Sequence, residues 1–230
     1  MSKANKSNKA IKYRLYPNDE QKVMFAKTFG CCRFVYNQLL ALQKQRYKDG
    51  ESHLSKLKSN EFATRTLKKD YDFLKEIDKF AVSNAVFHLA DAYDRFFKKQ
   101  NHFPKFKSKR KSKKSYTTNF TNNNILIGKN VIKLPKVGMV KAVIHKLPKD
   151  DWKLKSVTVS QDSVGNYFAS VLFEYEQEDI PSVSKSSTNA IGLDYKSDGL
   201  YMDSNGNKAG VHKYYRESHK KLAKEQRRLS

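Results

Sequence analysis

The residues best suited to chemistry form a run in which aromatic side chains alternate with cations. Phe103-Pro104-Lys105-Phe106-Lys107-Ser108-Lys109-Arg110 is followed shortly by Ser115-Tyr116-Thr117-Thr118-Asn119. Lysine and arginine neutralise phosphates, and phenylalanine and tyrosine rings stack on bases, so this pattern is typical of a nucleic-acid contact. The second run suits contacts with phosphates or base edges, although the same residue types more often build turns.

The charge around these runs is one-sided. Residues 95–149 hold 16 Lys or Arg and no Asp or Glu, whereas the rest of the chain holds 30 basic and 23 acidic residues. A concentrated positive charge repels itself, so it indicates a polyanionic partner, of which nucleic acid is the commonest. A solvated basic loop is the alternative interpretation.

A carboxylate near the C-terminus could bind a metal ion. Residues 190–195 read as a strand bearing Asp194, and residues 199–203 read as a second strand that follows a tight turn. Two-metal phosphodiester chemistry needs several carboxylates from different elements, so that two cations sit about 3.5–4 Å apart. One hairpin does not supply them, and Asp194 taken alone is an acid at the end of a strand.

The histidines and cysteines do not predict a metal site. His212 and His219 lie one heptad apart in a predicted helix, and no Cys or carboxylate joins them at ligand spacing. Cys31 and Cys32 are adjacent, which is a poor geometry for a structural disulfide, and two cysteines are too few for a zinc site. We expect them to be small buried residues.

The elements that position these residues begin with a strand and several helices. Residues 11–16 alternate apolar and basic side chains, which predicts a strand with one exposed face. Asn18 and Gln21 resemble a capping box, and glycines at 30 and 50 suggest helix ends. The predicted helical segments are 18–30, 34–48, a weak one at 61–74, and 81–99.

The helix predicted at 81–99 is the clearest because its apolar residues fall on one stripe. Phe87 lies on the opposite face among polar residues. We expect it to pack on another helix rather than to contact a base.

After Pro104 the pattern changes to short strands, which we predict at 125–127, 131–134, 139–144, 153–160 and 167–175. The last two flank Gly165-Asn166, a hairpin signal. One strand, several helices and then five strands predict an α+β chain, in which a helical bundle is inserted after the first strand of a small β-barrel or curled sheet. The acidic and then serine-rich segment 176–189 reads as a linker before a separate unit.

No apolar run approaches the roughly 18 residues that a membrane span requires, and residues 1–12 have no apolar stretch behind their lysines. We therefore expect a cytoplasmic protein with no membrane partner.

Six motifs, in this order along the whole chain, resemble the TnpB (OrfB) proteins of bacterial insertion sequences. Proteins of that family carry the name transposase, and they are understood as RNA-guided DNA endonucleases related to type V CRISPR effectors. The motifs are Tyr13-Arg14-Leu15-Tyr16-Pro17, Phe29-Gly30-Cys31-Cys32-Arg33-Phe34-Val35-Tyr36-Asn37, Phe103-Pro104-Lys105-Phe106-Lys107-Ser108-Lys109, Ser115-Tyr116-Thr117-Thr118, Leu134-Pro135-Lys136 and Gly192-Leu193-Asp194-Tyr195.

The resemblance implies a domain plan that agrees with the elements above. Residues 1–17 and 104–177 would form a wedge-like β-barrel, and residues 18–103 would form the inserted helical recognition domain. A linker at 178–189 would lead to residues 190–230, the first strands and a helix of an incomplete RuvC-like (RNase H-like) nuclease domain.

The resemblance also implies the partners, guide RNA and target double-stranded DNA, in a bacterial cytoplasm and on the nucleoid. Base pairing would supply sequence choice, and the protein would read only a short flanking motif. The positions here that look equivalent to the family's motif-reading residues are Ser83, Asn84, Tyr116, Thr117 and Thr118. Relatives often carry Gln where this chain has Ser83 and Asn84, so the motif read would differ. The implied binding residues are Arg33, Asn37, Ser83, Asn84, Lys105, Lys107, Lys109, Arg110, Lys113, Lys114, Tyr116, Thr117 and Thr118.

Asp194 matches the first of three acids in the family's RuvC site, where Mg²⁺ is the implied cofactor. The family places the other two acids and a four-cysteine zinc element further along than Ser230, so we expect this chain to have no zinc site, and to bind nucleic acid without cutting it. Two alternatives stay open. One is an active RNA-guided endonuclease completed in trans by a separate RuvC and zinc portion, and the other is a nuclease-dead RNA-guided regulator of DNA.

Overall fold

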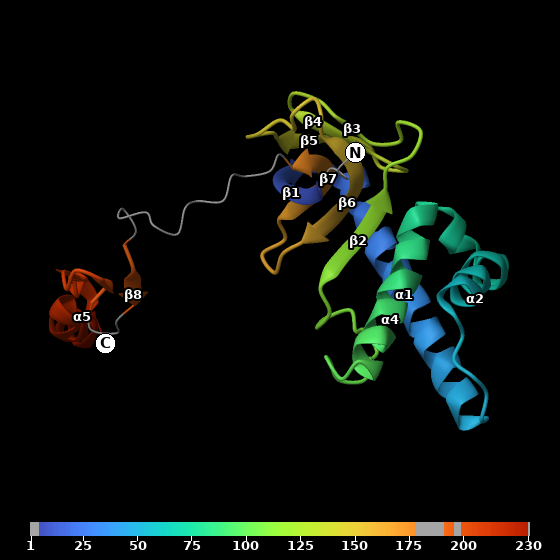
Figure 1. Cartoon of the computed structure of the whole chain (residues 1–230), viewed down its shortest axis with the longest axis horizontal. Helices are drawn as coiled ribbons and strands as arrows, with labels where there is room; N and C mark the ends of the chain where they lie inside the picture. Colours follow the sequence, from blue (N-terminus) through green and yellow to red (C-terminus); the bar gives the residue numbers. More distant parts are fainter. Residues whose placement is uncertain (1–4, 178–190, 196–198, 230) are drawn as a thin grey trace. The chain divides into compact units, whose positions relative to one another are not determined.

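The computed structural model describes residues 5–177, 191–195 and 199–229. The chain divides into two units, residues 1–178 and 179–230, which we describe separately (Figure 1). The predicted linker at 178–189 lies outside the described residues. No helix in the described part of the chain has the length and apolar character needed to cross a membrane.

The first unit is built on a seven-stranded antiparallel sheet with the order β2-β6-β7-β1-β5-β4-β3. The central strand β1 pairs with β7 over residues 5–15 and with β5 over residues 14–16. The strands are β1 (Asn5–Tyr16), β2 (Lys114–Asn119), β3 (Leu126–Ile127), β4 (Val131–Leu134), β5 (Gly138–Val143), β6 (Lys153–Gln161) and β7 (Tyr167–Gln177).

The sheet differs from the predicted barrel in one respect. No ladder joins the end strands β2 and β3 in the part of the chain that the structure describes. The strand β3 has only two residues, and the free side of β2 lies against helix α4 (Lys79–Phe97). The sheet is therefore open, and its β2 edge is covered by a helix, which protects it from pairing with another chain.

Helix α1 (Asp19–Lys48) corrects the prediction of two helices, because it runs unbroken through Gly30. Its capping box at Asn18 is confirmed, and Gly50 follows its end with φ +73°. Glycine inside a helix costs only about 1 kcal/mol. Burial of Phe29, Cys31 and Cys32 on either side of Gly30 offsets that cost.

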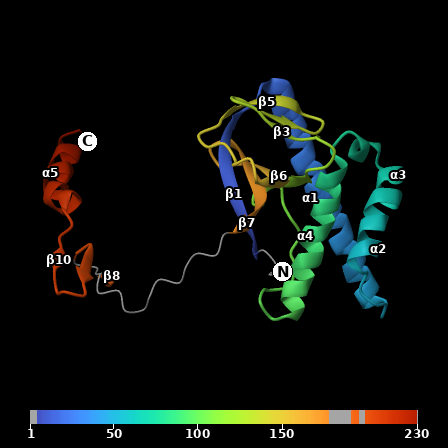
Figure 2. The same ribbon diagram turned by 45° about the horizontal axis from the view of Figure 1, so that its top comes forward.

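The remaining helical segments pack beside α1. They are α2 (Lys56–Glu61), a π-helical stretch (Phe62–Leu67), α3 (Lys68–Asp70), a 3-10 turn (Asp72–Lys75) and α4. Helices α1 and α4 lie side by side (Figures 1 and 2). Phe87 of α4 faces α2, where the Lys56 Nζ lies 4.6 Å from its ring centroid, so the predicted helix contact is confirmed.

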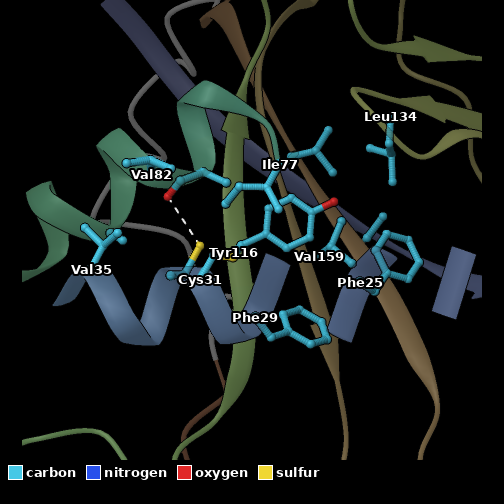
Figure 3. Packing of buried hydrophobic residues seen from close by; sticks show 14 of the residues in the cluster. Phe25, Phe29, Cys31, Val35, Ile77, Val82, Tyr116, Leu134 and Val159 are labelled. Atoms are coloured by element: carbon cyan, nitrogen blue, oxygen red, sulfur yellow. Dashed lines mark hydrogen bonds between the residues drawn. The ribbon is translucent and has the colours of Figure 1, made fainter. Parts of the chain in front are cut away.

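The helices join the sheet through a strand that the sequence reading missed. Residues 114–119 form β2, with Tyr116 and Thr118 turned inward and buried. The Tyr116 ring centroid lies 6.3 Å from that of Phe25 and 5.9 Å from that of Phe29, so these rings bind α1 to the sheet (Figure 3). Cys31 and Cys32 are free and buried in the same core, as predicted, and burial raises the pKa of the Cys32 thiol to about 12.

The second unit has little interior. Its strands β8 (Leu193–Tyr195), β9 (Tyr201–Asp203) and β10 (Lys208–Ala209) form a three-stranded antiparallel sheet, followed by helix α5 (Tyr214–Leu229). The predicted hairpin and helix are confirmed. None of the side chains described in this unit is buried.

Candidate nucleic-acid interface

The segment Lys105–Lys114, which we call the basic loop, leads into β2 and is attached to α1 through one asparagine. The Asn37 amide donates from Nδ2 to the Lys107 carbonyl at 2.9 Å, and its Oδ1 accepts from the Lys107 backbone N–H at 2.8 Å. Both ends of the Asn37 amide are therefore used inside the protein. Asn37 therefore positions the loop, and its contact with nucleic acid stays a prediction.

Part of the aromatic and cationic alternation is also satisfied inside the protein. The Lys107 Nζ lies 4.0 Å from the centroid of the Tyr36 ring, and the Lys44 Nζ lies 4.7 Å from that of Phe106. Burial lowers the pKa of the Lys107 ammonium. These cation–π contacts hold the start of the loop against α1.

The tip of the basic loop is shaped by two serines. The Ser108 backbone N–H donates to the Ser112 Oγ at 2.9 Å, and the Lys111 N–H donates to the Ser108 Oγ at 3.0 Å. This closed turn projects Lys109, Arg110 and Lys111 into solvent. A backbone turn of this kind presents three adjacent cations together.

The cations of the loop lack acidic partners. No carboxylate among the described residues lies within ion-pair distance of any of the loop's seven cations, and the Lys114 Nζ donates instead to the Gln161 side chain. The seven are Lys105, Lys107, Lys109, Arg110, Lys111, Lys113 and Lys114. The charge of the six exposed cations is therefore available to an external anion, whereas Lys107 lies against the Tyr36 ring.

Several predicted residues meet in one depression, which we call the basic pocket. It lies between α1, α4, the basic loop and β2, and its walls include Phe29, Cys32, Ala81 and Ala85. Its polar lining consists of Arg33, His88, Lys107, Ser112, Lys113, Lys114, Ser115, Tyr116 and Thr117. The structure thus brings six of the predicted residues together, namely Arg33, three loop lysines and two β2 residues, and it adds His88, which the prediction did not include.

His88 is the one histidine among the described residues that line the basic pocket. Partial desolvation lowers the pKa of its imidazole, and the charges of Lys107 and Lys56 lower it further, against an opposing effect of Asp91. His88 is consequently a neutral group among cations at pH 7. An anion entering the pocket would reverse part of that shift.

The residues predicted to read a flanking motif mostly connect elements. The Asn84 Nδ2 donates to the Thr117 carbonyl at 3.0 Å and to the Asn119 Oδ1 at 3.2 Å, which ties α4 to β2. The Thr118 hydroxyl is buried and donates to the Asp78 carboxylate at 2.6 Å.

The other three predicted readers are less exposed than the basic loop. Ser83 and Thr117 are half-buried, and the Thr117 hydroxyl lies 2.8 Å from that of Thr158. Tyr116 is 3% exposed, and burial raises the pKa of its phenol. Tyr116 and Thr118 therefore lie in the interior beneath the site, and their contact with nucleic acid stays a prediction.

A second basic depression, of about 500 Å³, was not anticipated from the sequence. It lies between the N-terminal end of α4 and the loops around residues 121–136, and Lys68, Lys75, Lys79 and Lys136 line it. Lys136 belongs to the motif Leu134-Pro135-Lys136, and this motif was the feature of the sequence that could have indicated the depression. The other three lysines lie in the helical region, where charge alternation gave no indication that they converge.

Asp194 lies in β8, and no second carboxylate among the described residues lies beside it. It pairs with Met202 across the hairpin, whereas Asp203 pairs with Leu193 and so faces the other side of the ladder. The Asp203 carboxylate accepts from the Asn205 and Asn207 backbone N–H groups and from the Asn207 side chain. Within the described ranges, no three His, Cys, Asp or Glu side chains form a metal-binding group, so the donors present do not fit a Mg²⁺ site.

Comparisons with known proteins agree with the motifs. A family model described as "Helix-turn-helix domain" (HTH_OrfB_IS605) matches residues 7–52. The "Putative RNA-guided DNA endonuclease" of Streptomyces pristinaespiralis is 31% identical over 224 residues, which cover 96% of this chain and 54% of that protein. The chain belongs to the TnpB (OrfB) family. In this TnpB-family chain, residues 7–52 contain β1 and one unbroken helix, α1, rather than two helices and a turn.

Two further relatives are similar in sequence. The "Putative RNA-guided DNA endonuclease InsQ" of Escherichia coli K12 is 29% identical over 228 residues, 96% of this TnpB-family chain and 53% of that protein. The "Virulence protein VsdF" of Salmonella dublin is 32% identical over 111 residues, 44% of this chain and 93% of that protein. The chain spans about half the length of the two relatives named as endonucleases.

Among solved structures, one titled "Cryo-EM structure of the Cas12f1-sgRNA-target DNA complex" is similar to this TnpB-family chain with a TM-score of 0.41 and 12% identity. The match covers 97% of this chain and 62% of that one. A similarity at this level carries no information about function.

Proposed function

We propose that this chain binds guide RNA and target double-stranded DNA through its basic loop and basic pocket, as the relatives named as RNA-guided endonucleases suggest. The observation that carries the proposal is the set of seven loop cations that have no acidic partner in the part of the chain that the structure describes. A folded surface retains such uncompensated charge at a cost, which a polyanion offsets by releasing its counterions.

Each part of the interface has a distinct role in this proposal. Lys109, Arg110 and Lys111 at the loop tip contact phosphates, and Asn37 fixes the loop on α1 so that these contacts are made without reordering it. Arg33 and Lys113 in the basic pocket hold a phosphate close to β2. Contacts of this kind fix the position of the nucleic acid without reading its sequence. In this proposal, sequence specificity comes from the base pairing of the guide RNA.

We further propose that the chain alone does not cleave DNA. Asp194 is a single exposed carboxylate, and Asp203 lies on the other face of its hairpin. Metal-assisted hydrolysis of a phosphodiester needs several converging carboxylates. The chain would therefore act as the nucleic-acid-holding part, and cleavage would need further acids that converge with Asp194.

Salt dependence tests the binding surface. The triple variant Lys109→Gln, Arg110→Gln, Lys111→Gln should bind a 30-base-pair duplex more weakly, and the slope of log K against log salt should become shallower by about 2–3, since each phosphate contact contributes about 0.9. The matched control Lys220→Gln, Lys221→Gln, Lys224→Gln removes the same charge from α5 and should change the slope less. Equal slopes in both variants, or a flat salt response of the wild type, would refute the proposal.

Guide dependence and cleavage separate the alternatives. The purified chain with guide RNA should occupy matched DNA and leave it intact in Mg²⁺, and Asp194→Ala should bind as the wild type does. Cleavage by the chain alone would contradict the binding-only proposal. Cleavage that appears only when a separate RuvC and zinc polypeptide is added would indicate the endonuclease completed in trans.

A further inference from the structure

An aromatic groove, separate from the basic pocket, lies where the C-terminal ends of α1 and α4 meet. Its volume is about 560 Å³, and it is lined by Gln43, Lys44, Tyr47, Lys48, Glu51, His53, Tyr93, Phe96, Phe97 and Phe103. Tyr47 is 84% exposed and Phe97 is 64% exposed. Contiguous exposed aromatic surface of this kind marks a binding site more often than a solvated surface.

The rings of the groove are already arranged for stacking. The Tyr93 ring centroid lies 5.6 Å from that of Phe103 and 4.6 Å from that of His53, and the Phe96 and Phe103 centroids are 5.2 Å apart. The Lys44 Nζ lies 5.5 Å from the Phe103 ring. The floor is therefore fixed by mutual packing, while Tyr47 and Phe97 extend from it into solvent.

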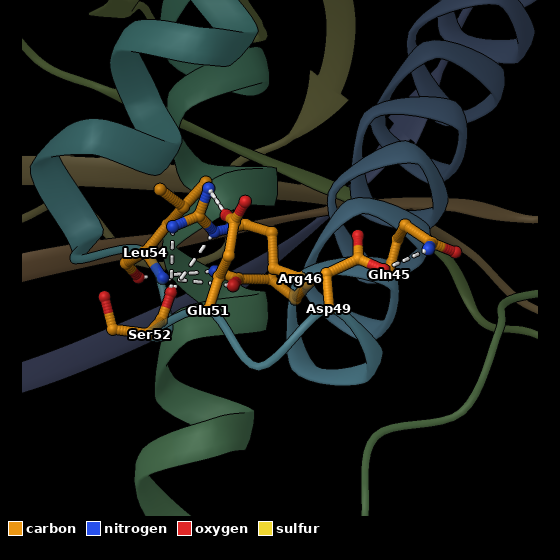
Figure 4. A network of polar contacts seen from close by, with 7 residues as sticks. Gln45, Arg46, Asp49, Glu51, Ser52 and Leu54 are labelled. Carbon is orange, nitrogen blue, oxygen red and sulfur yellow. Dashed lines mark hydrogen bonds and ion pairs between the residues drawn. The ribbon is translucent and has the colours of Figure 1, made fainter.

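Polar contacts also hold the wall of the groove in place. The Arg46 guanidinium donates to the Ser52 carbonyl at 3.2 and 3.0 Å and pairs with Glu51 (Figure 4). The Gln43 amide exchanges two hydrogen bonds with the Leu54 backbone. The loop that carries His53 is thus tied back to α1, so binding of a ligand would not include the entropic cost of ordering this loop.

The charge of the groove selects its occupant. Glu51 is the one acidic residue among the described residues that line it, and Arg46 neutralises this carboxylate. Lys44 and Lys48 remain at the rim, so the groove is apolar inside and positive outside. A second copy of the chain would bring the same cations together, which disfavours self-association. A single-stranded nucleic acid offers the complementary chemistry of flat apolar bases next to phosphates.

We propose that the aromatic groove stacks one or two unpaired bases of a single-stranded RNA or DNA segment, with Lys44 and Lys48 on the adjoining phosphates. This inference rests on the proposed function. It adds a site for bases to a surface that otherwise holds only phosphates, at the opposite end of α1 from its capping box.

The test compares oligonucleotides with and without bases. Binding of a labelled 15-nucleotide single strand and of an abasic strand of equal length to the full chain would be measured by fluorescence anisotropy. The wild type should prefer the strand with bases by roughly 5- to 100-fold. The double variant Tyr47→Ala, Phe97→Ala should lose this preference and keep its affinity for the abasic strand. Leu57→Ala, an exposed apolar residue of α2 outside the groove, is the matched control.

Direct stacking would be observed with Tyr47→Trp. The strand with bases should quench the new indole and the abasic strand should not, and the wild type, whose sole tryptophan is Trp152, supplies the baseline. Running RNA and DNA strands in parallel identifies which of them the groove takes. Circular dichroism checks that the variants remain folded, since both altered side chains are largely exposed.

Each failure has a separate meaning. A chain that binds neither strand contradicts the proposed function as a whole. A chain that binds both strands equally well, in the wild type and in the double variant, overturns only the stacking inference. A concentration-dependent dimer in sedimentation that Phe97→Ala abolishes also overturns it, and would assign the groove to a second copy of the chain.

Discussion

Among single residues, His88 couples pH to the proposed binding. Desolvation and Lys107 lower the pKa of its imidazole in the free protein, and a bound phosphate would raise it. Binding therefore takes up a proton, and affinity for a DNA duplex should rise as pH falls from 8 to 6, by no more than about tenfold for one unit of pKa change. Titrating affinity against pH at fixed salt checks this expectation.

His88→Gln supplies the control for that titration, because the chain contains five other histidines. The variant should show a smaller rise in affinity over the same pH range. If wild type and variant rise equally, His88 does not take up the proton.

Asn37 should affect binding through the position of the basic loop. Asn37→Ala removes two hydrogen bonds to the Lys107 backbone and should lower the free energy of unfolding by about 1–3 kcal/mol. It should also weaken duplex binding while leaving the salt slope unchanged, since no phosphate contact is lost. Asn37→Asp, which still accepts from the Lys107 N–H but cannot donate to its carbonyl, should show an intermediate loss. A shallower salt slope in Asn37→Ala would instead mean that Asn37 contacts nucleic acid.

For single residues, the sequence predicted which cations are exposed better than it predicted which side chains are hydrogen-bonded inside the protein. Lys105, Lys109 and Arg110 are exposed as expected, because a run of charge without acids has no way to be buried. Thr118 is buried because its hydroxyl bonds to Asp78, which lies 40 residues away in sequence. A partner at that distance in the chain is set by the packing of α4 on β2, and a local motif does not contain it.

Among the elements, the long helix α1 makes a prediction about its glycine. Gly30 has helical neighbours, and a Cβ built there meets no atom within 4 Å. Gly30→Ala should therefore raise the free energy of unfolding by about 0.5–1 kcal/mol. Gly50→Ala is the contrast, because the backbone at Gly50 has φ +73°, where a side chain is strained, and it should be destabilising.

Urea titration of both glycine variants measures these changes. Destabilisation by Gly30→Ala would mean that α1 is interrupted at that position, as the sequence pattern first indicated. The sequence led to that expectation because Gly30 resembles a helix end when tertiary packing is ignored. It missed β2 because the hydroxyl-and-amide run 115–119 resembles turn chemistry. Its tyrosine and threonines also favour strands, and the pairing with β6 decides between the two.

For the whole molecule, we expect the first unit to fold without the second. Every residue of the buried core cluster lies between Ile11 and Phe173, and no side chain described in residues 191–229 is buried. Residues 1–178 expressed alone should therefore melt within about 3 °C of the full chain, because a loss of 1 kcal/mol shifts Tm by only about 2–4 °C in a domain of this size. Their duplex affinity should match that of the full chain within about threefold.

Differential scanning calorimetry and limited trypsin digestion check this prediction. Digestion of the full chain should leave a resistant product close to residues 1–178. A fragment that aggregates, or a full chain that resists digestion as one piece to Ser230, would contradict the independence of the two units.

The central position of β1 also determines the order of events during synthesis. The strand leaves the ribosome before its main partner β7, which follows about 150 residues later. At about 5–20 residues per second this means a wait of about 8–30 s. During that time α1 and α4 can associate, because their contacts are closer in sequence. The nascent chain thus presents an unpaired strand for many seconds, and its lysines at positions 6, 9 and 12 are a built-in protection against premature edge pairing with other chains.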